Sequence, residues 1–285
     1  MKKRQKEYNI GGISFPAQVV AYVVMISFTV LTIGPLCWLV YSSFKTHKEI
    51  TMSPLSLPHE PTIKNYKIAW IDGKLGGAAV NSVIYTSVAT VLIVIFSVST
   101  GYAFAKFDYR VTKFFYGFFI LGLLVTVHSV LVPLFVMETK LGIVNTRLGV
   151  ILPYVAFGLP FAVYLATTYI KGIPGALVEA AVIDGASYLQ IFWYVILPVS
   201  TPIVATIIIF SFLGNWNEFI LVFVLTSKPF LRSLPVGINA FAGGLVIDFG
   251  LRFAALAIGT VPMIIFYLIF RKQVEQGFAG SAVKE

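Results

Sequence analysis

The sequence is poor in the residues that build disulfides and metal sites. Only one of its 285 residues is cysteine, and only three are histidine. Cys37 lies inside a long apolar segment, so it gives no evidence for a disulfide or a metal site. The histidines, at positions 47, 59 and 128, have no histidine or cysteine neighbour at a metal-binding spacing. We therefore expect no metal site.

Signatures of catalysis and of nucleotide binding are missing as well. No glycine-rich loop continues into the Lys-Ser or Lys-Thr pair that holds phosphates, and no serine lies in a Gly-x-Ser-x-Gly turn. The chain has no basic stripe, zinc spacing or base-stacking motif of the kind that nucleic-acid-binding proteins carry. We expect a protein that is not an enzyme, has no cofactor of its own and binds no nucleic acid.

Charge is also scarce. Only 12% of the residues are charged, against about a quarter in an ordinary soluble domain, whereas 58% are hydrophobic and the mean hydropathy is +0.89. This composition indicates an all-α membrane protein. Residues 1–285 are expected to form a single transmembrane domain with six spans, at about 16–43, 78–105, 114–137, 147–170, 201–225 and 252–271.

The loop 171–199, between the fourth and fifth predicted spans, contains the most informative segment. From Gly175 to Ala186 its only charged residues are Glu179 and Asp184. The segment is too short to cross a bilayer but apolar around most of a helix, so it needs a partner to cover it. Helix-start and helix-end signals predict two short helices in this loop, at 175–184 and 188–197. Pro174 suits the start of the first helix, and Gly185 can adopt the left-handed conformation that ends it. Ser187 and Gln190 have the spacing of a capping box at the start of the second helix.

The same segment resembles a known motif. It is similar to the EAA loop of the membrane subunits, or permeases, of bacterial ATP-binding-cassette (ABC) importers. Asn81-Ser82, the stretch from Asn215 to Glu218 and the end of the chain resemble the carbohydrate branch of that family, typified by the smaller membrane subunit of the maltose transporter. The residues that match the EAA loop are Glu179, Ala180, Ala181, Asp184, Gly185, Ala186, Phe192 and Pro198.

The resemblance implies a fold, a location and partners. It implies the type I ABC importer fold, in the bacterial inner membrane, with both termini in the cytoplasm. Lys and Arg divide almost evenly between the two sides of the predicted topology, so the orientation rests on the EAA loop, which is cytoplasmic in the family. The implied partners are a homologous second permease, two copies of an ABC ATPase that binds ATP and Mg, and an extracytoplasmic solute-binding protein. The implied function is import of a sugar or oligosaccharide.

Each candidate site has an alternative interpretation. Glu179 either meets basic residues of the ATPase or is an ordinary solvated carboxylate. Trp216, Asn217 and Glu218 suit a sugar path, but Glu218 also suits a snorkelling side chain or an inter-helix hydrogen bond, and in the family the second permease can make most substrate contacts. The tail 272–285 either enters the ATPase interface or is a frayed terminus. The tail residues that match the family are Gln276, Gly277, Gly280 and Lys284.

Two other functions fit parts of the sequence. A permease of another ABC importer class, for amino acids, phosphate or polyols, would share the EAA loop but should lack the Trp216–Glu218 stretch and the tail. A secondary transporter would be expected to show internal repeats and interrupted helices with buried ion ligands. No such repeat is visible in the sequence.

Overall fold

The computed structural model describes residues 15–241 and 248–282. Every regular element within these ranges is a helix, which confirms the predicted all-α class. Four helices are long and apolar enough to cross a membrane, and the number rises to six if each of two bent helix pairs counts as one span. The four are α1 (Phe15–Ser42), α4 (Leu75–Lys106), α7 (Arg147–Lys171) and α14 (Phe249–Ala282).

The first bent pair corresponds to the third predicted span. Instead of one helix over 114–137, α5 (Arg110–Gly122) and α6 (Val127–Leu141) meet at 104°. The last turn of α5 tightens, because the amides of Leu123 and Leu124 donate to carbonyls three residues back, 3.0 Å away in each case. α5 packs on α7, whereas α6 packs on the short helix α12 (Ile220–Leu225). The bend therefore follows from two different packing partners.

The fifth and sixth predicted spans also differ from the structure. The helix expected over 201–225 is broken, because α11 (Thr201–Asn217) ends at an extended Glu218 and α12 begins two residues later. The Glu218 carboxylate accepts hydrogen bonds from the Leu221 amide at 3.0 and 3.1 Å and so caps α12. The last helix continues beyond the predicted end at 271 to Ala282, through most of the predicted tail.

Helices α4 and α7 form the centre of the molecule and run parallel. Gly158 lies against Ile93, and Gly101 lies against Ala166 eight residues further along both helices. A Cβ on Gly101 would stand 2.7 Å from the Ala166 Cβ and 3.0 Å from the Thr167 amide nitrogen. Small residues that let two backbones approach this closely are typical of helix packing in membranes. The parallel packing brings the carboxyl ends of both helices to the same end of the molecule.

The loop between α12 and the next α-helix, α13, lies at the opposite end of α4. Helix α13 spans Leu234–Ala240. The Asn81 side-chain amide donates to the carbonyls of Phe230 and Arg232, at 2.7 and 3.1 Å, and the Tyr85 hydroxyl donates to the Leu231 carbonyl at 2.9 Å. The Ser82 hydroxyl accepts from the Leu234 amide at 2.7 Å. Asn81 and Ser82 therefore fix this loop on α4 by bonds that span about half of the sequence.

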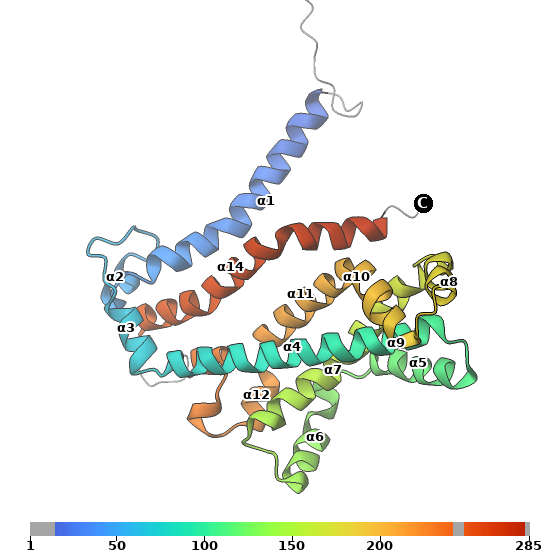
Figure 1. Cartoon of the computed structure of the whole chain (residues 1–285). Coiled ribbons are helices and arrows are strands. Elements are labelled where there is room, and N and C mark those ends of the chain that lie inside the picture. Colours follow the sequence, from blue (N-terminus) through green and yellow to red (C-terminus); the bar gives the residue numbers. More distant parts are fainter. Residues whose placement is uncertain (1–14, 242–247, 283–285) are drawn as a thin grey trace, which may run out of the picture.

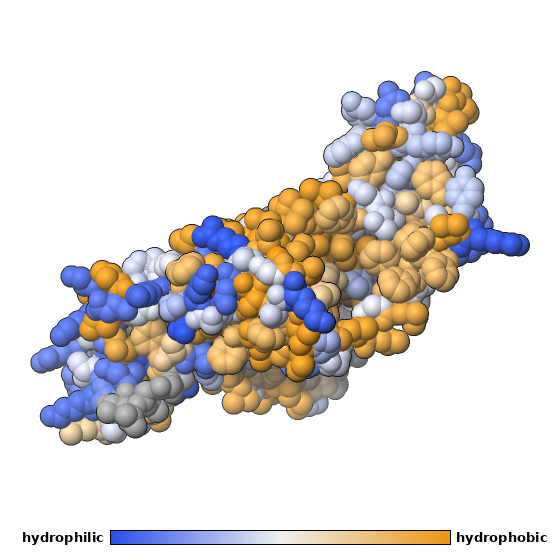
Figure 2. Space-filling model, turned by 90° about the horizontal axis from the view of Figure 1, so that it is seen from below, coloured by the Kyte–Doolittle hydropathy of each residue, from blue (hydrophilic) through white to orange (hydrophobic). Residues whose placement is uncertain are grey.

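Figure 1 shows the resulting arrangement. The short helices α8 (Gly175–Ile183) and α9 (Tyr188–Ile191) lie at one end, with α5 and the carboxyl end of α14, while α2 (His47–Met52) and α3 (Lys64–Ile71) lie at the other. Seen from below, hydrophobic residues cover most of the middle of the molecule, and many hydrophilic residues gather toward its left end (Figure 2). This pattern is the one expected of a bundle that crosses a bilayer.

Candidate functional site: the α8–α9 loop and a cavity beside α14

Helix α8 is bounded by the residues that its sequence predicts. It starts directly after Pro174 and ends in a left-handed Gly185, whose φ is +80°. The Gly185 amide donates to the Val182 carbonyl at 3.0 Å, and the Ala186 amide donates to the Ala181 carbonyl at 2.9 Å. These two bonds form a Schellman motif, which satisfies carbonyls that the end of a helix leaves without partners. The chain therefore turns sharply after α8.

The second short helix begins with the predicted capping box. The Ser187 hydroxyl accepts from the Gln190 amide, and the Gln190 side chain accepts from the Ser187 amide at 2.8 Å. After α9 the chain continues through a π-helical turn, Phe192–Ile196, and α10 (Leu197–Val199), then bends by 74° into α11. The two predicted helices of the loop are confirmed, and the π-turn within the second is an addition that the sequence did not indicate.

One face of this loop packs against the bundle. Val178, Ala181 and Ala186 are partly buried against a cluster formed by the carboxyl ends of α4 and α7 and by the segment after α9. Phe192 joins the same cluster, where its ring lies 5.4 Å from the ring of Tyr102. The fully or nearly fully buried members of the cluster are Tyr102, Ile170, Ile173, Ile191 and Ile196.

Polar bonds hold the loop on α4. The Lys106 ammonium donates to the Ile173 carbonyl at 3.1 Å, just before α8, and the Tyr102 hydroxyl donates to the Tyr188 carbonyl at 3.3 Å, at the start of α9. The ring of Phe107 packs edge-on against Tyr188, with centroids 5.3 Å apart. The loop is thus held at both helix starts, so α8 and α9 should move with α4 as one body.

The opposite face of α8 is exposed and has no partner within the described residues. Val182 and Ile183 are 54% and 85% exposed, and Glu179, Ala180 and Asp184 are exposed beside them. Among the described side chains the only ion pair joins Lys113 and Asp108, so Glu179 is unpaired there. An exposed apolar patch with unpaired carboxylates, Glu179 and Asp184, is suited to a groove that carries a basic residue.

The matched EAA residues thus divide between two faces. Ala181, Ala186 and Phe192 turn partly toward the bundle, whereas Glu179, Ala180, Asp184, Gly185 and Pro198 are exposed. The inward residues set the position of α8, and the outward residues belong to the exposed surface of the loop. The structure brings all eight together in one loop; their contacts with an ATPase stay a prediction.

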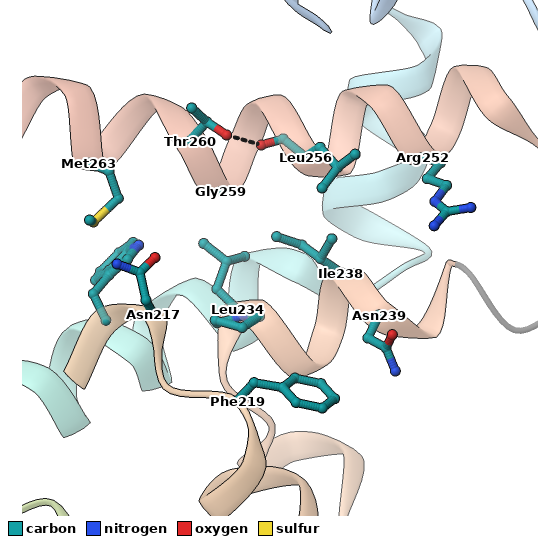
Figure 3. Close-up of a pocket in the computed structure, with 12 residues that line it drawn as sticks. Asn217, Phe219, Leu234, Ile238, Asn239, Arg252, Leu256, Gly259, Thr260 and Met263 are labelled. Carbon is teal, nitrogen blue, oxygen red and sulfur yellow. Dashed lines mark hydrogen bonds between the residues drawn. The ribbon is translucent and has the colours of Figure 1, made fainter. Parts of the chain in front are cut away.

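A cavity of about 550 Å³ lies at the other end of the bundle, between the end of α11, helix α13 and the first half of α14 (Figure 3). Its walls are largely apolar, with Leu234 and Ile238 on one side and Leu256 and Met263 on the other. Trp216, stacked on Phe212 at 5.7 Å, and Asn217 lie toward one end. Apolar walls with few polar groups are the usual composition of a small-molecule site.

The polar side chains of the cavity come from three helices. Asn217 belongs to α11, Asn239 to α13, and Arg252 and Thr260 to α14. The Asn217 amide nitrogen donates to the Leu213 carbonyl at 2.9 Å, and the Thr260 hydroxyl donates to the Leu256 carbonyl at 2.8 Å. Asn239 and Arg252 lie at the end of the cavity opposite Met263, where amide and guanidinium groups are placed to bind hydroxyl or carboxylate oxygens (Figure 3).

Trp216 and Asn217 thus line a cavity, as a substrate path requires. Glu218 does not line the cavity, because its carboxylate is bonded to the Leu221 amide at the start of α12. A role of Glu218 in a substrate path stays a prediction. Sequence reasoning missed Asn239 and Arg252. Arg252 is a charged residue within the start of the last apolar helix, and that position is the one signal that could have singled it out.

The structure describes the tail residues only in part. Gln276, Gly277 and Gly280 belong to α14, but the side chains of residues 272–282 are outside the description, and Lys284 lies beyond the described residues. Over the described ranges, no three His, Cys, Asp or Glu side chains come together in a group that could hold a metal ion.

Comparison with known proteins gives consistent matches over most of the chain. Residues 93–280 match the family described as "Binding-protein-dependent transport system inner membrane component". The chain is 36% identical to the diacetylchitobiose uptake system permease protein NgcG of Streptomyces coelicolor, covering 92% of this chain and 86% of that protein. It is 33% identical to the multiple sugar-binding transport system permease protein MsmG of Streptococcus mutans. That match covers 92% of this chain and 96% of that protein.

A solved structure has the same fold. One chain of a bacterial ABC transporter involved in the import of the acidic polysaccharide alginate superimposes with a TM-score of 0.81. The match covers 91% of this chain and 98% of that chain at 22% sequence identity. The chain therefore shares its fold with one subunit of that transporter.

Proposed function

Because the chain belongs to the family of binding-protein-dependent transport system inner membrane components, we propose that it is the permease subunit of an ATP-driven importer of a sugar or oligosaccharide. The resemblance to this family is confirmed, and the protein is a membrane permease. Support for sugar as the substrate class comes from relatives named for sugar uptake, among them NgcG and MsmG. The trehalose/maltose transport system permease protein MalG of Thermococcus litoralis, 32% identical over 90% of this chain, adds to that support.

The observation that carries the proposal is the free face of α8. It is apolar, it holds the unpaired carboxylate of Glu179, and it lies at one end of the bundle. We assign this face to an ABC ATPase, present in two copies, which binds ATP and Mg and performs the hydrolysis. A basic residue of the ATPase would meet Glu179 in a partly desolvated pair, which is stronger than a surface pair.

The attachment of the loop suggests how force is transmitted. When the two ATPase subunits close on ATP, α8 is pulled with them, and the bonds from Lys106 and Tyr102 carry that movement into α4. Close packing of Gly101 against Ala166 carries it further into α7. The permease would thereby shift, together with a homologous second permease, between inward-facing and outward-facing states.

The cavity beside α14 is the candidate place for sugar contact on this chain. Trp216 offers an apolar ring and Asn217 a planar amide, a combination that suits the C–H face and the hydroxyls of a sugar. A solute-binding protein on the outer side would deliver the sugar. The alternatives are import of an amino acid, phosphate or polyol by the same machinery, or secondary transport. The names of the relatives favour the sugar.

The test is uptake by the reconstituted complex. The chain is purified with its partner subunits, placed in proteoliposomes with ATP inside, and supplied with the solute-binding protein and labelled sugars. We expect uptake that requires ATP and survives a proton uncoupler. Uptake that continues without ATP and collapses with the uncoupler would instead establish a secondary transporter.

A charge reversal tests the coupling face within the same assay. Glu179→Lys should abolish uptake and release the ATPase on purification, while the protein stays in the membrane. Asp108→Lys is the matched control, because Asp108 is a surface carboxylate of the α4–α5 connection that pairs with Lys113 and lies outside α8. Normal ATPase retention and normal uptake by the Glu179→Lys protein would remove the role assigned to this face.

A further inference from the structure

The loop between α2 and α3, residues 53–63, folds back beside the last turn of α1 (Figure 1). Two side chains of α1 hold it there. The Trp38 indole donates to the Pro54 carbonyl at 2.9 Å, and the Tyr41 hydroxyl donates to the Leu55 carbonyl at 3.0 Å. Trp38 is one turn before the end of α1 at Ser42, so this loop returns toward the level of the membrane span instead of extending away from it.

A buried cation completes the attachment. Lys45 is fully buried, and its ammonium donates to the Ser53 carbonyl at 2.9 Å and to the Ser56 hydroxyl at 3.1 Å. A lysine almost never loses all contact with solvent unless its charge is well solvated by other groups. The carbonyls of residues 53, 54 and 55 are therefore all bonded to side chains rather than left for water.

Some amides of this loop are bonded or absent, whereas those of residues 55–57, 60 and 63 have no partner within the described residues. Pro54, Pro58 and Pro61 have no amide hydrogen. The His59 amide donates to the Glu49 carboxylate at 2.6 Å, and the Thr62 amide donates to the Phe44 carbonyl at 2.9 Å. Irregular backbone in the hydrocarbon core must be bonded to protein, whereas water can satisfy the remaining groups at the membrane interface.

The side chains of the loop point the other way. Leu55, Leu57 and Ile63 are 77%, 70% and 75% exposed. Met52, at the end of α2, is 72% exposed. Residues in the middle of α1, a candidate membrane span, have the same exposure, for example Leu31 at 74%. Four large apolar side chains this exposed, on or beside a loop that is held against α1, call for an apolar environment.

We propose that residues 52–57 form a membrane anchor whose apolar side chains, Met52, Leu55 and Leu57, insert into the interfacial region of the bilayer. The leaflet is the one opposite α8, which by the proposed function is the outer leaflet. Continuity with α1 identifies lipid as the occupant, because the most apolar 18-residue window of α1 is entirely unburied and the anchor lies directly beside the end of that helix.

The flanking residues fit the same level of the membrane. Trp38 and Tyr41 are amphipathic rings of the kind that concentrate at the membrane interface. Lys48 and Lys64, exposed on either side of the anchor, are placed to meet lipid phosphates. The anchor would fix the depth of α1, which within the described residues packs chiefly against α14 and has little protein of its own to hold it.

Site-directed spin labelling in the complete transporter tests the proposal. Cys37 is replaced by serine, single cysteines are introduced at Leu55 or Leu57, and the labelled complex is reconstituted in phosphatidylethanolamine–phosphatidylglycerol nanodiscs. Collision rates are measured with oxygen, which concentrates in lipid, and with a water-soluble nickel chelate. Val24 in the middle of α1 is the lipid control, and the exposed Lys67 of α3 is the water control.

We expect the ratio of oxygen to nickel collision rates at both anchor positions to be several-fold above that at Lys67 and to approach that at Val24. A ratio equal to that at Lys67 would show that the loop faces water and would overturn the proposal. Low collision rates with both reagents would show that a protein subunit covers the patch, and would overturn it as well.

The hydrogen bond between Trp38 of α1 and the loop allows a second test of the proposal. Trp38→Phe keeps an aromatic ring but removes the donor to the Pro54 carbonyl, so the nickel collision rate at Leu55 should rise several-fold. Trp70→Phe is the matched control, because no hydrogen bond of the Trp70 indole is found in the described part of the chain, and it should leave the rate unchanged. An unchanged rate in the Trp38→Phe protein would contradict the proposed placement of the loop.

Discussion

Gly185 offers the sharpest test of how α8 is held. Its φ of +80° lies in the left-handed region, which costs roughly 1–2 kcal/mol for a residue with a Cβ. A Cβ at this position would meet no atom within 4 Å, so the penalty is conformational and not steric. Asparagine tolerates this conformation better than alanine, and a β-branched valine tolerates it worst.

The expected size of the effect follows from that penalty. A loss of one or two kcal/mol lowers the population of an ordered state roughly 5- to 30-fold. The state in question is the Schellman turn formed by the amides of Gly185 and Ala186, which sets the direction of the chain between α8 and α9. If the ATPase docks only on the formed turn, ATP hydrolysis stimulated by the binding protein should fall in the order Asn, Ala, Val.

Gly142 provides a matched control. It also has a positive φ, +68°, and open space around its Cβ direction, but it ends α6 and lies outside the 171–199 loop. The same three substitutions at Gly142 should cost similar stability and leave coupled ATP hydrolysis nearly intact. Both series are assayed in proteoliposomes for stimulated ATP hydrolysis and for retention of the ATPase. Full coupling in the Gly185→Val protein, or equal loss of coupling in the Gly142 series, would refute the reasoning.

Three further predictions concern packing, the cavity and the tail. Gly101→Leu should lower the melting temperature in detergent, because overpacking against Ala166 costs about 1–3 kcal/mol, whereas Gly117→Leu, which has open space, should not. Asn217→Leu should reduce sugar uptake with an unchanged melting temperature, and normal uptake would exclude a role in the substrate path. Deleting residues 276–285 should lower stimulated ATP hydrolysis without preventing membrane insertion; hydrolysis at the intact rate would mean that the tail is only a terminus.

The parts of the molecule that the sequence predicted are those governed by local rules. The turn at Gly185 and the capping box of Ser187 and Gln190 depend on residues within one helical turn of each other, and both are present as predicted. The six apolar segments are likewise a local property, and each corresponds to one or more helices.

The parts that escaped prediction depend on distant contacts. Gly122 ends α5, but one glycine within an apolar segment does not predict a 104° bend; α5 and α6 diverge because they pack on different helices. Glu218 was expected inside a continuous helix, but its carboxylate ends one helix and caps the next. Arg252 and Asn239 reach one cavity only because α13 folds against α14, and nothing near either residue in the sequence indicates that contact.

The π-helical turn Phe192–Ile196 allows the loop to hold one extra residue without a change in its orientation. A π-turn is equivalent to one residue inserted into an α-helix, and each α-helical residue advances the chain by about 100° around the axis. Removing one of these five residues would restore ordinary α-helical geometry and leave Glu179 facing much the same way relative to α11, whereas a residue removed from an α-helical segment would rotate everything beyond it by about 100°. The orientation of the Glu179 carboxylate therefore does not depend on the extra residue, because the wider turn absorbs it.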